Sequence, residues 1–124
     1  MNLSTHKLIS TLTAAATEIN RLENKAKTLL YEHADQRGYH EQLREKAILL
    51  SELAEEATQL NDLSPQLKAL VKERVGAFSF EADRALRLDS VFYMSVLLYP
   101  EDYLEGQPNE LEDFINDLLS ARNP

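Results

Sequence analysis

The stretch STHKLISTLTAAATEINRLENKAKTLL, residues 4–30, decides the fold because its apolar side chains recur on one helical face. Successive apolar or small residues are separated by steps of 4, 3, 4, 3, 4 and 3. They are Leu8, Leu12, Ala15, Ile19, Leu22, Ala26 and Leu29. A 3.5-residue repeat of this length is typical of coiled-coil packing against another long helix. We therefore predict a helix that begins near Ser4, spans about 30 residues or roughly 45 Å, and makes the molecule elongated.

A second helix is predicted after the segment EHADQRGYHEQ, which interrupts the first pattern. Gly38 is the residue expected to end the first helix in a left-handed conformation. Two adjacent apolar stripes follow it over about residues 39–60. One consists of Leu43, Ala47, Leu50, Ala54 and Ala57, and the other of Leu49, Leu53 and Leu60. Such a broad face contacts two neighbours, so we predict a bundle in which residues 4–61 form a long antiparallel hairpin.

A third helix is predicted to begin at Ser64 and Pro65, which are residue types preferred at the N-cap and in the first turn. Its apolar steps are Leu67, Val71, Val75, Phe78, Ala82 and Ala85. Phe78 and Phe80 do not share one side of a straight helix. We therefore predict a helix break near Gly76 that buries both rings. The alternative is that Phe80 projects outward as an anchor for a protein partner.

The segment VFYMSVLLY, Val91–Tyr99, is rich in β-branched and aromatic residues, as a strand would be. No other segment offers a strand to pair with it, and an unpaired strand leaves its backbone polar groups unsatisfied. We therefore predict that this segment is helical and buried on most sides. It either continues the third helix or forms a separate short helix capped by Ser90, within a helical region of about residues 65–99.

Pro108 is predicted to open a last, acidic helix over about residues 108–121. Its apolar stripe consists of Leu111, Phe114, Ile115, Leu118 and Leu119. An amphipathic helix of about a dozen residues is marginal alone in water, so it needs an apolar surface. We expect it to dock on its own bundle. The alternative is a detachable helix that binds a partner's groove through Leu111, Phe114, Ile115 and Leu118.

The chain has 124 residues, and we expect it to form one domain over residues 1–124. Its composition limits the classes of function that we expect. The net charge is −8, and residues 101–124 contribute −6 of it through seven acidic residues and Arg122. A net basic face is required to bind nucleic acid or an anionic membrane surface, so we expect neither as a partner. The chain has no cysteine, targeting segment or long apolar run, and we expect a cytoplasmic location.

Two groups of residues could in principle bind a metal ion. His33 and His40 flank the predicted turn between the first and second helices. They are not spaced as two ligands on one helical face. Glu52, Glu55 and Glu56 follow on the second helix. The spacing Glu52-x-x-Glu55 is similar to half of the motif of the all-α nucleotide pyrophosphohydrolases, which hold magnesium between paired carboxylates. The second pair of that motif, Glu-x-x-Asp one helix later, is missing from this sequence.

These patterns together predict an all-α, elongated antiparallel bundle of four to five helices. The function we expect is non-enzymatic: an adaptor or chaperone-like protein that binds a protein partner or itself, without a cofactor. A homodimer is predicted because the apolar stripes exceed what one elongated monomer covers. The partner-binding candidates are Phe80 and the stripe Leu111, Phe114, Ile115 and Leu118. The alternative is a metal-dependent hydrolase that uses the glutamates near residue 55, with His33 or His40.

Overall fold

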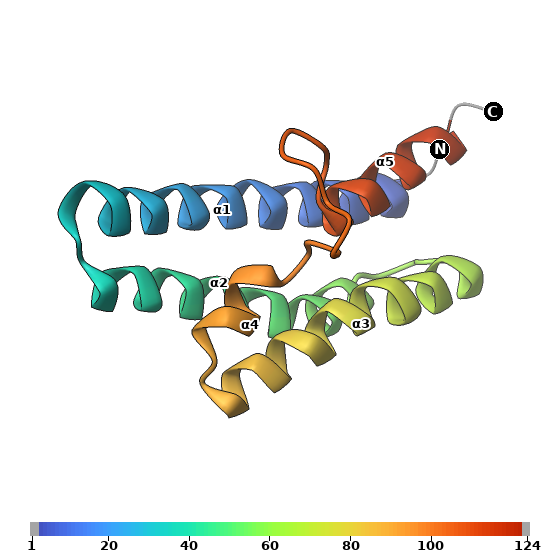
Figure 1. Ribbon diagram of the computed structural model, residues 1–124. Helices are drawn as coiled ribbons and strands as arrows, with labels where there is room; N and C mark the ends of the chain where they lie inside the picture. The colour runs from blue at the N-terminus through green and yellow to red at the C-terminus, as the bar shows by residue number, and fades with distance from the viewer. Residues whose placement is uncertain (1–2, 123–124) are drawn as a thin grey trace.

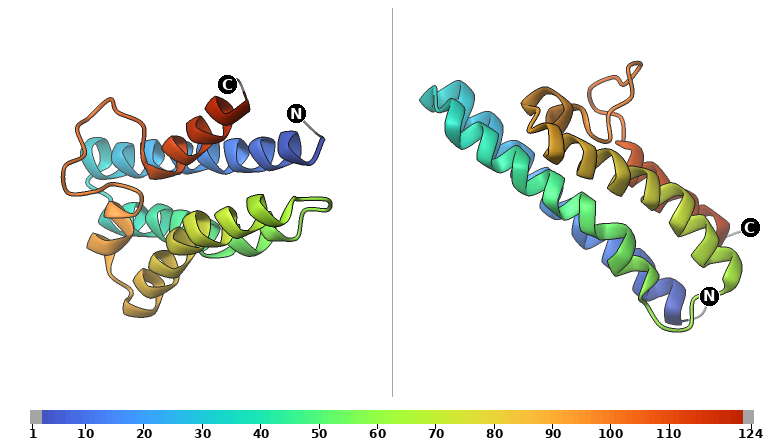
Figure 2. Two further views of the ribbon diagram at one scale, coloured as in Figure 1. Left: turned by 90° about the vertical axis from the view of Figure 1, so that its right-hand side faces the viewer. Right: turned by 90° about the horizontal axis from the view of Figure 1, so that it is seen from below.

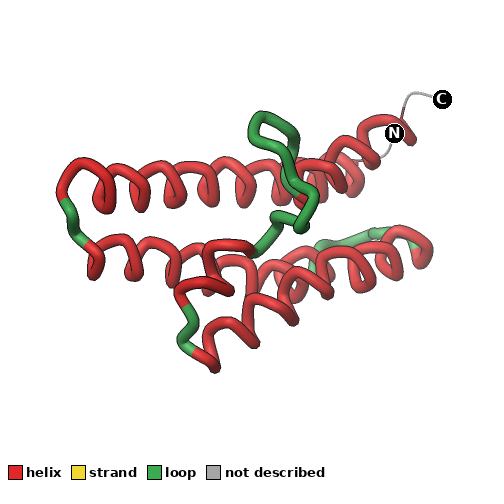
Figure 3. The backbone as a smooth tube through the Cα atoms, viewed as in Figure 1, coloured by secondary structure: helices red, strands yellow, loops and turns green. Residues whose placement is uncertain are grey.

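The computed structural model describes residues 3–122, which form five α-helices and contain no strand (Figures 1 and 3). The helices are α1 (Leu3–His33), α2 (Gln36–Thr58), α3 (Pro65–Leu88), α4 (Val91–Val96) and α5 (Glu110–Arg122). The predicted all-α helical bundle is confirmed, whereas the elongation and the coiled-coil geometry stay predictions. Within the described residues, no helix combines the length and the apolar character needed to cross a membrane.

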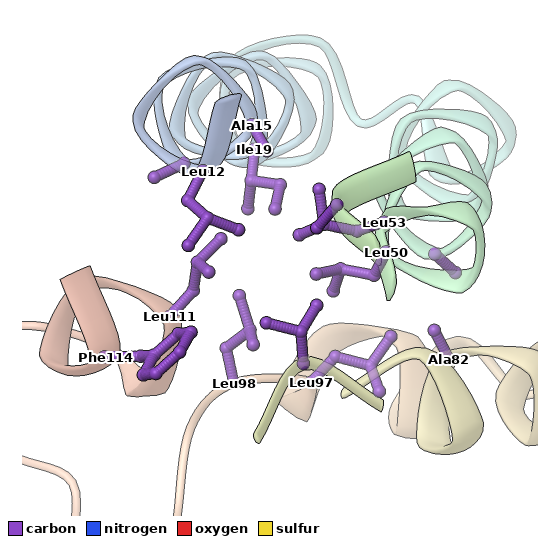
Figure 4. Packing of buried hydrophobic residues seen from close by; sticks show 14 of the residues in the cluster. Leu12, Ala15, Ile19, Leu50, Leu53, Ala82, Leu97, Leu98, Leu111 and Phe114 are labelled. Atoms are coloured by element: carbon purple, nitrogen blue, oxygen red, sulfur yellow. The ribbon is translucent and has the colours of Figure 1, made fainter. Parts of the chain in front are cut away.

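The hairpin of α1 and α2 is the centre of the fold, and the two helices run antiparallel beside each other (Figures 1 and 2). α3 and α4 pack on α2, and α5 packs on α1. Six of the seven predicted stripe positions on α1 are buried, and Leu29 is half-buried. Figure 4 shows Leu12 and Ile19 of α1 facing Leu50 and Leu53 of α2 across the core. The 3.5-residue repeat therefore forms the interface that organises the bundle.

The turn between α1 and α2 differs from the prediction in the role of Gly38. Ala34, with φ of 51°, is the left-handed residue there, and Gly38 lies inside the first turn of α2. The Gly38 N–H donates to Oδ1 of the N-cap Asp35 at 2.8 Å. A Cβ at Gly38 would overlap the Asp35 carboxylate and lie 3.0 Å from Leu29 Cδ1. Glycine is therefore needed here for close approach, and its predicted role as a helix end is wrong.

The predicted start of α3 is confirmed, and the predicted break inside it is wrong. The Ser64 hydroxyl accepts a hydrogen bond from the Leu67 N–H at 3.1 Å, and Pro65 occupies the first turn. α3 then continues through Gly76 without interruption, because one glycine costs a helix only about 1 kcal/mol. Phe78 is half-buried and Phe80 is 67% exposed. The outward-facing alternative for Phe80 is the one that the structure shows.

The segment after α3 is a separate short helix, which was one of the two alternatives for this segment. Asp89 ends α3 in a left-handed conformation with φ of 48°, and the Ser90 hydroxyl caps α4 by accepting from the Tyr93 N–H at 3.2 Å. α4 packs on α2 and α3, but it is not buried on most sides. Met94 is fully buried there, whereas Phe92, Tyr93 and Val96 are exposed.

The acidic final helix docks on its own bundle, as expected. Leu111 and Phe114 of α5 are fully buried against the core, and Figure 4 shows both side chains directed toward it. Pro108 precedes the helix and does not open it. The N-cap is Asn109, whose side chain accepts from the Glu112 N–H while the Glu112 carboxylate accepts from the Asn109 N–H, both at 2.9 Å. This reciprocal pair is a capping box, which satisfies two backbone donors at the helix start.

Candidate functional site

Exposed apolar side chains concentrate on α3 and α4. Nine large apolar residues are exposed in the described chain, and more than half of them belong to these two helices. We call five of them the α3–α4 surface: Phe80, Leu88, Phe92, Tyr93 and Val96. Isolated exposed apolar residues are ordinary, but a group on adjacent elements indicates an interaction surface. This group is therefore the candidate functional site.

A pocket of about 300 Å³ lies between α3, α4 and the start of α5. Apolar residues of α2, α3 and α4, and of the segment directly after α4, line this pocket. The lining residues are Leu50, Ala77, Phe78, Glu81, Arg84, Ala85, Tyr93, Val96, Leu97, Leu98 and Glu110. Three of these are charged, and the remainder are apolar, with the Tyr93 hydroxyl as an additional polar group. Concave apolar sites with a few polar groups are typical of binding sites, because apolar area gives affinity and polar groups give orientation.

The turn at Asp89 positions α4 beside α3. Two side chains of α2 hold this turn: His40 Nε2 lies 3.1 Å from Asp89 Oδ1, and Arg44 Nη1 lies 3.3 Å from the same oxygen. The rings of Phe92 and Tyr93 meet edge to face, with centroids 5.7 Å apart. Edge-to-face pairs are a favoured aromatic geometry. The exposed rings are therefore presented in a defined arrangement on a helix that is anchored at its start.

The charged groups of the pocket include one carboxyl group with a perturbed pKa. Partial burial raises the pKa of Glu110, the neighbouring Asp113 raises it further, and Arg74 opposes the change. The Arg74 guanidinium itself lies over the Phe114 ring, 4.8 Å from its centroid, and contacts Asp117 at 3.2 Å. Arg74 therefore links α3 to α5.

The predicted metal ligands are not brought together. Glu52, Glu55 and Glu56 are exposed along α2, and His33 is exposed at the end of α1. His40 contacts Asp89 near the start of α4. Within residues 3–122, no three His, Cys, Asp or Glu side chains are placed to share a metal ion. The hydrolase stays an alternative that the geometry does not favour.

The predicted partner-binding residues separate into two groups. Phe80 lies on the α3–α4 surface and is 67% exposed. The four residues of the α5 stripe are buried in the chain's own core, so a partner reaches them only if α5 leaves α1: Leu111, Phe114, Ile115 and Leu118. Their proposed role in a partner's groove stays a prediction.

Sequence reasoning missed a buried polar cluster of Glu23, Lys46 and Tyr99, which we call the sealed cluster. The Lys46 side chain is 0% exposed, and its Nζ lies 2.8 Å from Glu23 Oε2. The Tyr99 hydroxyl donates to Glu23 Oε1 at 2.6 Å, and Lys46 Nζ lies 5.1 Å from the Tyr99 ring centroid. The only signal in the sequence is that Lys46 lies within the apolar stripe of α2, between Leu43 and Leu50.

Two ionisable groups of the sealed cluster, Lys46 and Tyr99, have shifted pKa values. Burial lowers the pKa of Lys46, because an ammonium is poorly solvated in the interior, while Glu23 acts in the opposite direction. Burial also raises the pKa of Tyr99, and the hydrogen bond to the Glu23 carboxylate raises it further. Lys46 has no exposed surface through which a ligand could reach it. The cluster therefore joins α1, α2 and the loop after α4, and we treat it as structural.

Searches of known protein families, curated proteins and solved structures find no match to this chain, so the assignment of function depends on the site itself.

Proposed function

We propose that this chain is a non-enzymatic interaction protein, of the adaptor or chaperone-like kind, that binds a protein partner on the α3–α4 surface. The observation that carries the proposal is the group of exposed aromatic side chains beside a pocket of about 300 Å³. Water solvates such rings poorly, so burying them against a partner is favourable. Binding of this kind needs no reaction chemistry.

The residue types on this surface are those that contribute most to protein–protein affinity. Aromatic side chains and arginine are enriched among the residues whose truncation weakens binding. Phe80, Phe92 and Tyr93 are aromatic, and Arg84 lines the pocket together with Tyr93. Scaled from about 200 Å² for a whole aromatic side chain, the exposed fractions of Phe80, Phe92 and Tyr93 leave roughly 350 Å² of ring surface in total. Continuous exposed apolar areas of about 300–600 Å² are often functional.

The remaining structure supports this role as a rigid scaffold. The sealed cluster and the docked α5 hold the helices together away from the α3–α4 surface. Arg44 and His40 fix the turn before α4, so the exposed rings do not depend on a flexible loop for their position. Preorganised surfaces lose less conformational entropy on binding.

Site-specific photocrosslinking in the host cell tests the proposal. A photoreactive phenylalanine analogue is placed at Phe92, which is 67% exposed on the α3–α4 surface. The control carries the same analogue at Tyr31, which is 80% exposed on α1 and lies outside the pocket. We expect discrete crosslinked protein species from position 92 and none, or only diffuse background, from position 31. Equal labelling at the two positions, or no discrete species from position 92, would contradict the proposal.

A further inference from the structure

α3 carries a second stripe of residues on the side that faces solvent. Its members are separated by steps of 3, 4, 3, 4 and 4, and we call them the outer seam: Leu70, Glu73, Ala77, Phe80, Arg84 and Leu88. All six are exposed, whereas the buried residues of α3 are Val71, Val75, Ala82 and Ala85 on the other side. The outer seam extends over about 27 Å of helix. Spacing of three and four residues is what a helix needs to pack lengthwise against another helix.

The middle of the outer seam is flat because small residues flank it. A Cβ atom added at Gly76 would meet nothing within 4 Å, so the packing of this chain does not require glycine there. A glycine inside a helix costs about 1 kcal/mol relative to alanine. Gly76 and Ala77 together allow a neighbouring helix to approach closely, with Phe80 projecting beside them. The seam therefore combines a flat region with one large side chain.

Two charged residues of the seam lack an ionic partner in the described chain. Arg87 pairs with Asp83 at 2.7 Å, and Arg74 pairs with Asp117 at 3.2 Å. Glu73 and Arg84 form no ion pair within residues 3–122, and they are the second and the fifth of the six seam residues. A partner helix that presents an arginine at one end and a glutamate at the other would match both.

We infer that the partner on the outer seam is a second copy of this chain, with the two α3 helices antiparallel. A two-fold axis between positions 78 and 79 sets Phe80 level with Ala77 of the second copy. The same axis sets Glu73 level with Arg84 of the second copy, and symmetry repeats each contact. A large ring thus meets a small residue, and each unpaired charge meets its opposite. Such self-complementarity is the requirement for an isologous dimer.

The net charge of the chain does not oppose this contact. The whole sequence carries −8, but α3 itself carries five basic and three acidic residues, a local charge of +2. The excess negative charge lies in residues 101–124, which include α5. Charges further apart than about 10 Å are largely screened at moderate salt. Two copies that meet through α3 therefore place their least acidic helix at the interface.

The outer seam also contributes apolar area to such a contact. Its large apolar members are Leu70, Phe80 and Leu88, which are 36%, 67% and 56% exposed. This inference rests on the proposed function, because Phe80 and Leu88 belong to both the outer seam and the α3–α4 surface.

Charge reversal followed by light scattering over a concentration series tests the register. We expect the wild-type chain to form dimers, and Glu73→Arg or Arg84→Glu to weaken dimerisation at least tenfold, because each single change creates two repulsive pairs. The double variant Glu73→Arg/Arg84→Glu restores both attractions and is expected to recover dimerisation to within about threefold of wild type. Arg37→Glu is the control, since the Arg37 side chain is 92% exposed and lies outside the seam.

Crosslinking provides a second measurement that does not depend on affinity alone. The chain has no cysteine, so Glu73→Cys and Arg84→Cys each carry a single thiol. With a short bismaleimide at high protein concentration, the inferred register predicts crosslinked dimers when the two variants are mixed. Each variant alone should crosslink poorly, because identical positions lie about 16 Å apart along antiparallel helices.

The outcomes separate this inference from the proposed function. A wild-type chain that stays monomeric to a few hundred micromolar overturns the inference, as does a double variant that dimerises no better than the single variants. If the chain is monomeric while position 92 still crosslinks a different protein, the proposed function survives with another partner. If it dimerises as inferred but position 92 forms no crosslink in cells, the dimer contact stands and the proposed function fails.

Discussion

The sealed cluster and the α3–α4 surface both depart from the usual rule that charged residues are exposed and apolar residues are buried. The sealed cluster buries charged groups, and the α3–α4 surface exposes apolar ones. In the sealed cluster, a lysine with no exposed surface lies deep in the bundle, and every charge there has a partner. On the α3–α4 surface, about half to two thirds of each aromatic side chain is exposed to water. The first arrangement is complete within one chain because each buried group satisfies another. We propose that another molecule covers the second, and for this reason we assign function to that region.

The largest difference in unfolding free energy is expected between truncation of a phenylalanine in the core and truncation of one on the α3–α4 surface. Phe114 is 0% exposed in the core and Phe80 is 67% exposed on the surface. We expect Phe114→Ala to reduce the free energy of unfolding by about 3–5 kcal/mol, because it removes buried apolar area and leaves a cavity. Phe80→Ala should change it by less than about 0.5 kcal/mol when measured on the monomer. Urea unfolding at low protein concentration gives both values, and similar losses for the two variants would contradict the contrast.

The next largest effect concerns the charges of the sealed cluster. Glu23→Gln leaves the Lys46 ammonium buried without a carboxylate, and we expect a loss of about 3 kcal/mol in unfolding free energy. Adding Lys46→Met should recover most of this loss, because no uncompensated charge then remains in the interior. Urea unfolding of the single and double variants checks both values. A double variant no more stable than Glu23→Gln would show that the ion pair is not the source of the effect.

The stability of the protein at alkaline pH should depend on the ionisation of Tyr99. The pKa of Tyr99 is raised above its ordinary value of 10, so above pH 10 the folded state holds more protons than the unfolded state. Stability from Tyr99 is therefore present below pH 10 and falls as the pH rises beyond it. The lowered pKa of Lys46 acts in the opposite direction, so its contribution rises with pH up to the ordinary value of 10.5.

Tyr99→Phe should therefore lose about 2 kcal/mol at neutral pH, since the hydrogen bond to the Glu23 carboxylate is lost. It should also lose stability less steeply than wild type above pH 10, although the raised pKa of Tyr39 leaves a residual slope. Urea midpoints measured from pH 7 to the alkaline limit check both statements. An unchanged alkaline slope in Tyr99→Phe would refute the assignment of the titration to this residue.

The smallest effects concern two glycines that replacement by alanine should change in opposite directions. Gly38→Ala forces a Cβ into the Asp35 carboxylate and disturbs the α2 cap, so we expect a loss of about 1–2 kcal/mol. Gly76→Ala meets open space in the monomer and should stabilise it by about 0.5–1 kcal/mol. Thermal unfolding at low protein concentration measures both changes. Destabilisation of the monomer by Gly76→Ala would show a contact that the structure lacks.

Local signals account for the parts of the fold that were predicted correctly. The 3.5-residue repeat in α1 and the serine caps at Ser64 and Ser90 are properties of neighbouring residues, so they can be read without a structure. The errors at Gly38 and Gly76 have one cause. Glycine tolerates a left-handed backbone, but it also serves where space is short or where a helix lies exposed, and the sequence does not distinguish these uses.

The site was predicted only in part because it depends on the relative placement of distant segments. Phe80 was identified as a possible anchor from its position relative to Phe78, which is a local argument. The segment 91–99 was predicted to be buried on most sides, yet Phe92, Tyr93 and Val96 are exposed. An apolar run does not reveal which of its sides a neighbouring helix covers. The sealed cluster joins residues 23, 46 and 99, and no periodic pattern links positions so far apart.

The docking of α5 on α1 has a consequence for how the chain folds during its synthesis. Asn20 of α1 donates to Glu112 of α5 at 3.4 Å, across 92 positions of sequence. At about 5–20 residues per second, a ribosome needs roughly 5–20 s to translate that interval. During that delay α2 is already available to cover most of the apolar face of α1, and only the part that α5 covers stays open on the nascent chain.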